Sequence, residues 1–218
     1  MELLQRPEIQ RRLSLSDKSG LFIDPLLDQD QVGEVTIDLR LGCDFLVSVL
    51  TRKPFINIVK DEGGFRGLAS YYRGTRRELG DRLVLYPSQL VLACTLEYVA
   101  LPSDVYADVL TRSSYTRLGV HMNTMIQPGF RGCFPIELFN SSNNPVELVV
   151  GSRVFQTRLF ALQEESDYSA GSEPRKYVAT SGPSFHEPLK TPTCLVCFKF
   201  KRNASLLLAR MLLSAGIC

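Results

Sequence analysis

Apolar side chains occupy every odd position of residues 35–41, and polar side chains occupy every even one. Because successive side chains of an extended chain point to opposite faces, this alternation predicts a β-strand with one apolar face. Further short apolar runs, separated by proline, glycine and asparagine, follow at residues 83–85, 90–93, 105–110, 146–150 and 154–159. Many short strands at this spacing predict a mainly β fold of the barrel or sandwich type.

Two segments outside these runs follow other patterns. Residues 1–14 space their leucines and isoleucine roughly as a helix does, with Pro7 near the start, where a helix tolerates proline. Residues 52–81 are charged, rich in glycine and aperiodic, which predicts a long surface excursion between strands. We therefore expect a short N-terminal helix before a β domain that carries one long loop.

The C-terminal part of the chain differs in composition from the rest. Residues 163–192 hold many serines, glycines, prolines and charges but few large aliphatic side chains, so they cannot form a core of their own. Residues 206–213 are apolar and helix-prone but far shorter than a membrane span. We interpret the chain as one domain over residues 1–162, a flexible tail over 163–192 that folds over a site, and an extension over 193–218.

Charge and composition limit the possible functions. The chain has 218 residues, of which 44% are hydrophobic, enough for one domain with a substantial core. Its 25 basic and 23 acidic residues give a formal charge of +2, which predicts neither nucleic-acid nor membrane binding. Charges stand where a signal peptide would be apolar, and there is no run of about 18 apolar residues. We therefore expect a soluble, cytoplasmic protein.

The six cysteines lie mostly inside apolar runs, which is typical of small buried side chains in a reducing compartment. Only Cys194 and Cys197 are close together. A structural zinc site needs four ligands, and the two histidines, His121 and His186, show no ligand spacing. The sequence therefore predicts no protein-bound metal.

Four stretches carry a more specific signal. In chain order they read VTIDLRLG at residues 35–42, LPSD at 101–104, RSSYTRLG at 112–119 and QPGFRGCFPIELFN at 127–140. Together they resemble the dCTP deaminases of the dCTP deaminase and dUTPase superfamily. The resemblance implies a distorted jelly roll or β-barrel that assembles as a homotrimer, with active sites between neighbouring subunits that are closed by the C-terminal tail.

The resemblance also implies hydrolytic deamination of dCTP to dUTP and ammonia in pyrimidine deoxynucleotide metabolism. The chain has no His-x-Glu paired with Pro-Cys-x-x-Cys, so the zinc-hydroxide route of other cytidine deaminases is absent. Magnesium is expected to arrive with the triphosphate, because it keeps waters and needs few protein ligands.

Glu137 is the residue that matches the proton shuttle of the family. Its position between Ile136 and Leu138 suggests partial desolvation, which would raise its pKa and favour a usable acid form. Taken without the resemblance, Glu137 also fits a solvent-facing glutamate on an alternating strand.

The motif at residues 112–119 combines two arginines and two serine hydroxyl groups within six residues, a composition suited to triphosphate oxygens. The resemblance assigns Arg112 and Ser114 to the phosphates, and Ser113 and Arg117 to catalysis beside the reacting base. The alternative is a helix start with Ser114 as the N-cap, and both can hold because a helix N-terminus itself binds anions.

The resemblance implies further substrate-binding residues: Asn123, Gln127, Ile136, Gln156, Lys176 and Tyr177. The family usually has aspartate at Gln127, and glutamine can bind a sugar hydroxyl but cannot act as a base. Deamination without dUTP hydrolysis is therefore the favoured hypothesis. The alternatives are a dUTP diphosphohydrolase and a catalytically silent deoxynucleotide-binding regulator on the same fold. His121 is interpreted as a structural or subunit-contact histidine.

Overall fold

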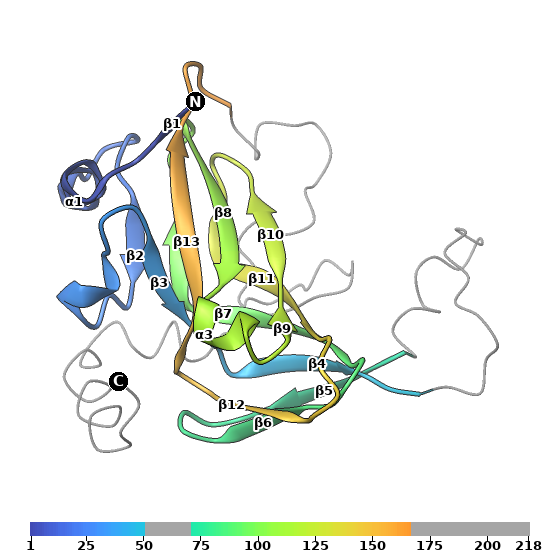
Figure 1. The fold of residues 1–218 in the computed structure, drawn as a ribbon. Helices are drawn as coiled ribbons and strands as arrows, with labels where there is room; N and C mark the ends of the chain where they lie inside the picture. The colour runs from blue at the N-terminus through green and yellow to red at the C-terminus, as the bar shows by residue number, and fades with distance from the viewer. Residues whose placement is uncertain (51–70, 167–218) are drawn as a thin grey trace, which may run out of the picture.

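A computed structural model describes residues 1–50 and 71–166, which form two main antiparallel sheets (Figure 1). The five-stranded sheet contains β1 (Glu2–Leu3), β13 (Arg153–Ala161), β8 (Val105–Thr111) and β10 (Asn123–Ile126) in this order, with β3 (Ile37–Arg40) paired to β13. The six-stranded sheet contains β5 (Tyr72–Arg76), β4 (Asp44–Ser48), β7 (Leu90–Ala100), β11 (Arg131–Asn140) and β9 (Val120–His121), with β2 (Phe22–Asp24) paired to β7. A small third sheet pairs β6 (Arg82–Leu85) with β12 (Val146–Val149).

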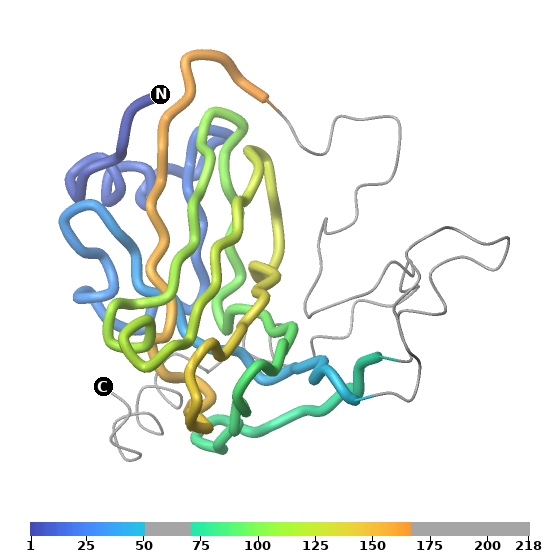
Figure 2. The backbone as a smooth tube through the Cα atoms, turned by 45° about the vertical axis from the view of Figure 1, so that its right-hand side comes forward, coloured from blue at the N-terminus to red at the C-terminus, as the bar shows by residue number. Residues whose placement is uncertain are grey.

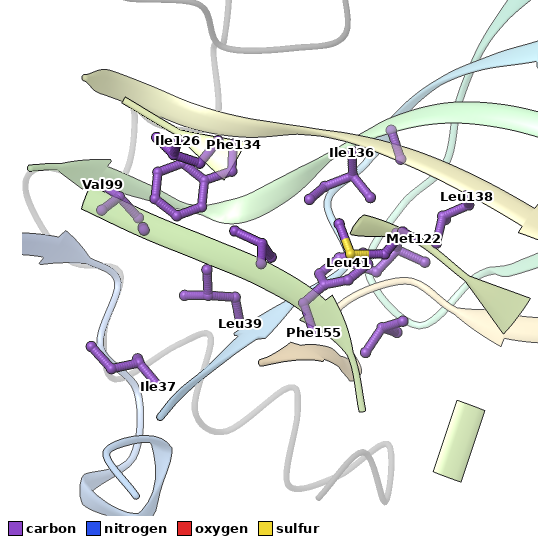
Figure 3. Close-up of a cluster of buried hydrophobic side chains, with 14 of the residues drawn as sticks. Ile37, Leu39, Leu41, Val99, Met122, Ile126, Phe134, Ile136, Leu138 and Phe155 are labelled. Atoms are coloured by element: carbon purple, nitrogen blue, oxygen red, sulfur yellow. The ribbon is translucent and has the colours of Figure 1, made fainter. Parts of the chain in front are cut away.

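The two main sheets enclose one hydrophobic core. Leu39 and Phe155 come from the five-stranded sheet, and Ile136 and Leu138 come from the six-stranded sheet (Figure 3). Each of these side chains is at most 1% exposed. Burying a side chain of this size stabilises a fold by about 1.5–3 kcal/mol, so the alternating strands are held chiefly by this shared interior.

The architecture confirms the expected mainly β, jelly-roll-like fold. In the described parts of the chain, the sheets do not close into a barrel. Figure 2 shows the N-terminus at the same end of the molecule as the end of β13, where Glu2 pairs with Ala161. Among the helices of residues 1–50 and 71–166, none has the length and hydropathy needed to cross a bilayer.

The expected N-terminal helix is present as α1 (Arg6–Ser14), with Pro7 in its first turn. It begins later than expected, because Glu2 and Leu3 form a strand instead. An ion pair fastens α1 to the sheets: the guanidinium of Arg12 donates to both carboxylate oxygens of Asp104, at 2.9 and 2.7 Å. Arg12 is thereby buried, although it lies on a short surface helix.

Two expectations about the strands need correction. The segment 52–81 is not all surface excursion, because Tyr72–Arg76 forms β5 and pairs with β4; residues 51–70 lie outside the described residues. The strand expected at 35–41 is shorter, Ile37–Arg40, and is buried on both faces. Its polar face is covered because Asp38 and Arg40 form ion pairs with residues that are distant in the sequence.

Three of the six cysteines, Cys43, Cys94 and Cys133, lie in the described residues, and all three are buried as expected. The division of the C-terminal part into a tail and an extension falls almost entirely on residues 167–218, outside the described residues. It stays a prediction.

Candidate functional site

A tight turn after β8 presents the serine and arginine motif. The helix α3 (Ser113–Thr116) follows Arg112, whose N–H donates to the carbonyl of Val154 at 2.8 Å and whose carbonyl accepts the N–H of Tyr115 at 2.9 Å. Arg112 is therefore the N-cap, so the alternative in which Ser114 is the N-cap is wrong. Ser113 and Ser114 of α3 are both exposed, so their hydroxyl groups face solvent.

The chain leaves α3 through Arg117 and Gly119 and then enters β9. Gly119 has φ +86°, and a Cβ there would lie 2.6 Å from the Cβ of Ser142, so both conformation and space require glycine. This turn allows β9 to pair with β11, where His121 stands opposite Phe139. The motif is thus fixed next to the end of the strand that carries Glu137.

Two other predicted binding residues lie on one cross-strand row of the five-stranded sheet. Gln156 of β13 is opposite Asp38 of β3 on one side and Leu110 of β8 on the other. Leu110 is in turn opposite Asn123 of β10. Residues directly opposite one another in antiparallel strands share a face, so Asp38, Gln156 and Asn123 lie on the same side of this sheet.

Glu137 lies on the outer face of the six-stranded sheet. Its neighbours Ile136 and Leu138 point into the core, and on its own face it stands opposite Leu92 of β7, which is opposite Leu46 of β4. Burial among these neighbours is the largest cause that raises the pKa of Glu137 above its ordinary value of 4.5, and a backbone hydrogen bond of Glu137 itself opposes it. The expected direction of the shift is confirmed, although Glu137 is exposed to solvent in the single chain.

Tyr72 of β5 lies close enough to Glu137 for the charge of the carboxylate to affect the pKa of its phenol. Burial raises the pKa of Tyr72, and the negative charge of Glu137 raises it further. Since β5 and β11 are separated by two strands in the sheet, this pairing has no local sequence signal.

Gln127 begins the connection from β10 to β11. Its side chain is exposed, and its carbonyl accepts the N–H of Phe130 at 3.3 Å. Gly129 supplies the positive φ of +76° that the turn needs. The Ile136 side chain is buried in the core, so any contact of Ile136 with a substrate must use its main chain.

The described chain presents these candidates in separate groups. Arg112, Ser113, Ser114 and Arg117 gather at α3, whereas Glu137 lies on β11, the strand that pairs with β9. Within residues 1–50 and 71–166, no hydrogen bond or ion pair joins Glu137 to Ser113 or Arg117. Lys176 and Tyr177 lie outside the described residues.

Sequence reasoning missed one neighbour of the motif. Nη1 of Arg112 lies 3.5 Å from Oδ2 of Asp38, and Nη1 of Arg153 lies 4.0 Å from the same oxygen. Aspartate is disfavoured in strand interiors, so its presence on the alternating strand at residues 35–41 was the available signal.

No cluster of three or more histidine, cysteine, aspartate or glutamate side chains that could hold a metal ion occurs in the described ranges. Magnesium that arrives bound to a triphosphate needs few protein ligands, so this finding leaves the expectation of magnesium untested.

Comparison with known proteins assigns the family. A sequence model described as dCTP deaminase-like matches residues 3–162. The chain belongs to the dCTP deaminase-like family. A dCTP deaminase, dUMP-forming, of Methanobrevibacter smithii is 38% identical over 143 residues, which are 64% of this chain and 72% of that protein.

Two further relatives of this dCTP deaminase-like protein cover more of its length. The dCTP deaminase, dUMP-forming, of Methanosphaera stadtmanae is 34% identical over 188 residues, 84% of this chain and 92% of that protein. The dCTP deaminase of Haloarcula marismortui is 34% identical over 186 residues, 83% of this chain and 92% of that protein. Two of these relatives are thus named dUMP-forming, and the third is named dCTP deaminase without this addition.

A solved structure supports the fold. The crystal structure of 2'-deoxycytidine 5'-triphosphate deaminase from Agrobacterium tumefaciens matches with a TM-score of 0.53 and 24% sequence identity. The match covers 72% of this chain and 48% of the Agrobacterium tumefaciens chain, so the protein spans about half the length of that chain. At this level of identity the likeness concerns the fold of the dCTP deaminase-like family alone.

Proposed function

We propose that this protein hydrolyses the 4-amino group of dCTP to give dUTP and ammonia. The observation that carries the proposal is Glu137, a carboxylate with a raised pKa within the residues that match the family model; the sequence resemblance assigns this residue to the proton shuttle. A carboxyl group with a raised pKa accepts and donates protons more readily near neutral pH, and one such residue can serve every proton transfer of this reaction.

The reaction balances with water as the only other substrate. The water oxygen forms a bond to C4 of the cytosine while Glu137 takes the water proton. Glu137 gives this proton to N3, then takes the second proton from the new hydroxyl group on C4 and gives it to the amino group, so that the C4–N4 bond breaks and ammonia leaves. The new oxygen stays on C4, so the product base is uracil and the phosphates are unchanged.

The α3 motif supplies the groups for the rest of the substrate. Arg112 and Ser114 bind the phosphates, since a guanidinium and a solvent-facing hydroxyl are suited to anionic oxygens. Ser113 and Arg117 orient the attacking water and Glu137. Asn123, Gln127 and Gln156, with the main chain of Ile136, bind the nucleoside, and Lys176 and Tyr177 of the tail close on the phosphates.

The active protein is a homotrimer with sites between subunits, bound to magnesium through the triphosphate, and works in the cytoplasm. Within the described residues no hydrogen bond or ion pair joins Glu137 to Ser113 or Arg117, which supports an intersubunit site, because a second copy can bring its α3 to the exposed face that carries Glu137.

The product is dUTP rather than dUMP. Releasing pyrophosphate from dUTP needs a group that activates water, and the amide of Gln127 cannot accept a proton as a carboxylate does. Because two relatives are named dUMP-forming, the proposed product differs between members of one family.

The test is to incubate the purified protein with magnesium and, separately, dCTP, CTP, dCMP or dUTP. We expect ammonia and dUTP from dCTP alone. Pyrophosphate from dUTP would support the diphosphohydrolase alternative. Tight binding of dCTP without any product would support a catalytically silent regulator and overturn the proposal.

A further inference from the structure

Asp38 contacts the motif at α3 although it belongs to a strand 74 positions earlier in the chain. Its Oδ2 lies 3.5 Å from Nη1 of Arg112, with the Asp38 side chain 11% exposed and the Arg112 side chain 38% exposed. The carboxylate is therefore largely enclosed, while part of the guanidinium reaches solvent. A guanidinium has five N–H donors, more than one contact with Asp38 can use, so Arg112 can also donate to a ligand.

The position of Asp38 is fixed from several directions. Its backbone is paired to Gln156 in the β3 to β13 ladder. Its carbonyl accepts a hydrogen bond from Nε2 of the fully buried Gln31 at 3.0 Å. Nη1 of Arg153 lies 4.0 Å from Oδ2 of Asp38, the oxygen that Arg112 also approaches, and Nη2 of Arg153 donates to Asp28 at 2.6 Å. The backbone of Asp38 is thus fixed by hydrogen bonds, and its side chain, 11% exposed, lies within 4.0 Å of two guanidinium groups.

The ion pairs continue from Asp28 into the core. Oδ2 of Asp28 also accepts a hydrogen bond from Nη2 of Arg40 at 2.9 Å. Nη1 of Arg40 lies 3.2 Å from the buried carboxylate of Glu97. Positive and negative groups alternate along this chain, which connects the interior between the sheets to the exposed guanidinium of Arg112.

We propose that Asp38 is a positioning residue that holds the Arg112 guanidinium in place for the phosphates of the substrate. The proposal rests on the proposed function, which assigns Arg112 to the phosphates. An arginine held at its backbone and at one amino group loses less rotamer freedom on binding than an unrestrained one. Asp38 therefore contributes to triphosphate affinity through Arg112, without touching the substrate.

If Asp38 acted only through its charge, its replacement would change the affinity for phosphate in the opposite direction. Asp38 is negative and near the proposed phosphate site, so removing its charge would strengthen anion binding if repulsion were its only effect. The direction of the change in affinity therefore decides between positioning and repulsion.

The test is calorimetric titration of the full-length protein with inorganic tripolyphosphate and with dCTP. We expect Asp38→Ala to weaken tripolyphosphate binding about three- to tenfold, the size expected from releasing one rotamer-rich side chain. Asp38→Asn, which keeps an acceptor oxygen, should retain part of the affinity. Asp104→Asn is the matched control, because it alters an aspartate paired to another arginine and should leave the affinity unchanged.

A double-mutant cycle separates positioning from general damage. In an Arg112→Ala background, changing Asp38 should have no additional effect on tripolyphosphate affinity, because its effect passes through Arg112. Unchanged or tighter binding by both Asp38 variants would overturn the proposal, as would equal losses with and without Arg112. Because tripolyphosphate cannot be deaminated, wild-type protein that binds it but releases no ammonia from dCTP contradicts the proposed function and leaves this comparison intact.

Discussion

Glu97 and Arg40 form an ion pair between the two sheets, with Oε1 of Glu97 3.2 Å from Nη1 of Arg40. The other carboxylate oxygen accepts the backbone N–H of Arg40 at 2.8 Å, so one side chain of β7 ties down both the backbone and the side chain of β3. Gln31 donates to the same carboxylate at 3.2 Å. All the neighbours of Glu97 in this group are donors.

This arrangement predicts how stability changes with pH. Burial, partly offset by Arg40, raises the pKa of Glu97 from 4.5 to about 7. The folded state therefore keeps a proton on Glu97 at pH values where the unfolded chain has released it. The stabilisation from this proton is fully present below about 4.5 and is lost as the pH rises through about 7.

We expect Glu97→Gln to change the free energy of unfolding little at pH 6, because its uncharged amide replaces a carboxyl group that is mostly protonated at that pH. The variant should also lack the part of the decline between pH 5 and 8 that Glu97 causes. Urea denaturation of both proteins across this range measures the difference. Parallel pH profiles would show that Glu97 does not titrate there.

Replacing Glu137 tests the proton shuttle. We expect Glu137→Gln to lower kcat for dCTP by about a thousandfold, since glutamine cannot transfer protons, while dCTP still binds. Because the pKa of Glu137 is raised and the ionised form must accept the first proton, kcat/KM of the wild type should fall on the acid side with a midpoint above 4.5. Glu147→Gln, on an exposed glutamate of β12 paired to Arg82, is the control and should stay active.

Gln127 should determine where the reaction stops. We expect wild-type protein to release no pyrophosphate from dUTP, and Gln127→Asp to gain this activity, because a carboxylate can activate water and an amide cannot. A coupled pyrophosphate assay measures both proteins. Pyrophosphate release by the wild type at a rate similar to its ammonia release would refute this role of Gln127.

The contact between α1 and the sheets should contribute strongly to stability. Asp104→Ala would leave the nearly buried Arg12 with Glu8 as its remaining acidic partner among the described residues, and we expect a loss of about 3 kcal/mol. Glu147→Ala, which breaks the solvent-exposed pair with Arg82, should cost less than about 1 kcal/mol. Thermal unfolding of the two variants gives the comparison, and equal losses would contradict it.

The sequence predicted the β architecture because alternation and short apolar runs report directly on burial. It did not predict β5, since Tyr72–Arg76 contains one glycine and two arginines, and this strand depends on its pairing with β4. It also could not show that the polar face of β3 is buried. The ion pair that covers Arg40 comes from Glu97, 57 residues away, and no local pattern encodes such a partner.

For the candidate site, local sequence placed Ser113, Ser114 and Arg117 in one turn and indicated the raised pKa of Glu137. The common row of Gln156 and Asn123 depends on the register of three strands, which the sequence does not reveal. The contact between Asp38 and Arg112 likewise results from tertiary packing.

The most direct test of the account is the mass of the nucleotide formed from dCTP and magnesium in water enriched in oxygen-18. The account predicts dUTP with one heavy oxygen, located on the base, together with one ammonia for each dUTP formed by the wild type and almost none by Glu137→Gln. Unchanged dCTP, or dUMP released with heavy oxygen in a phosphate group, would contradict it.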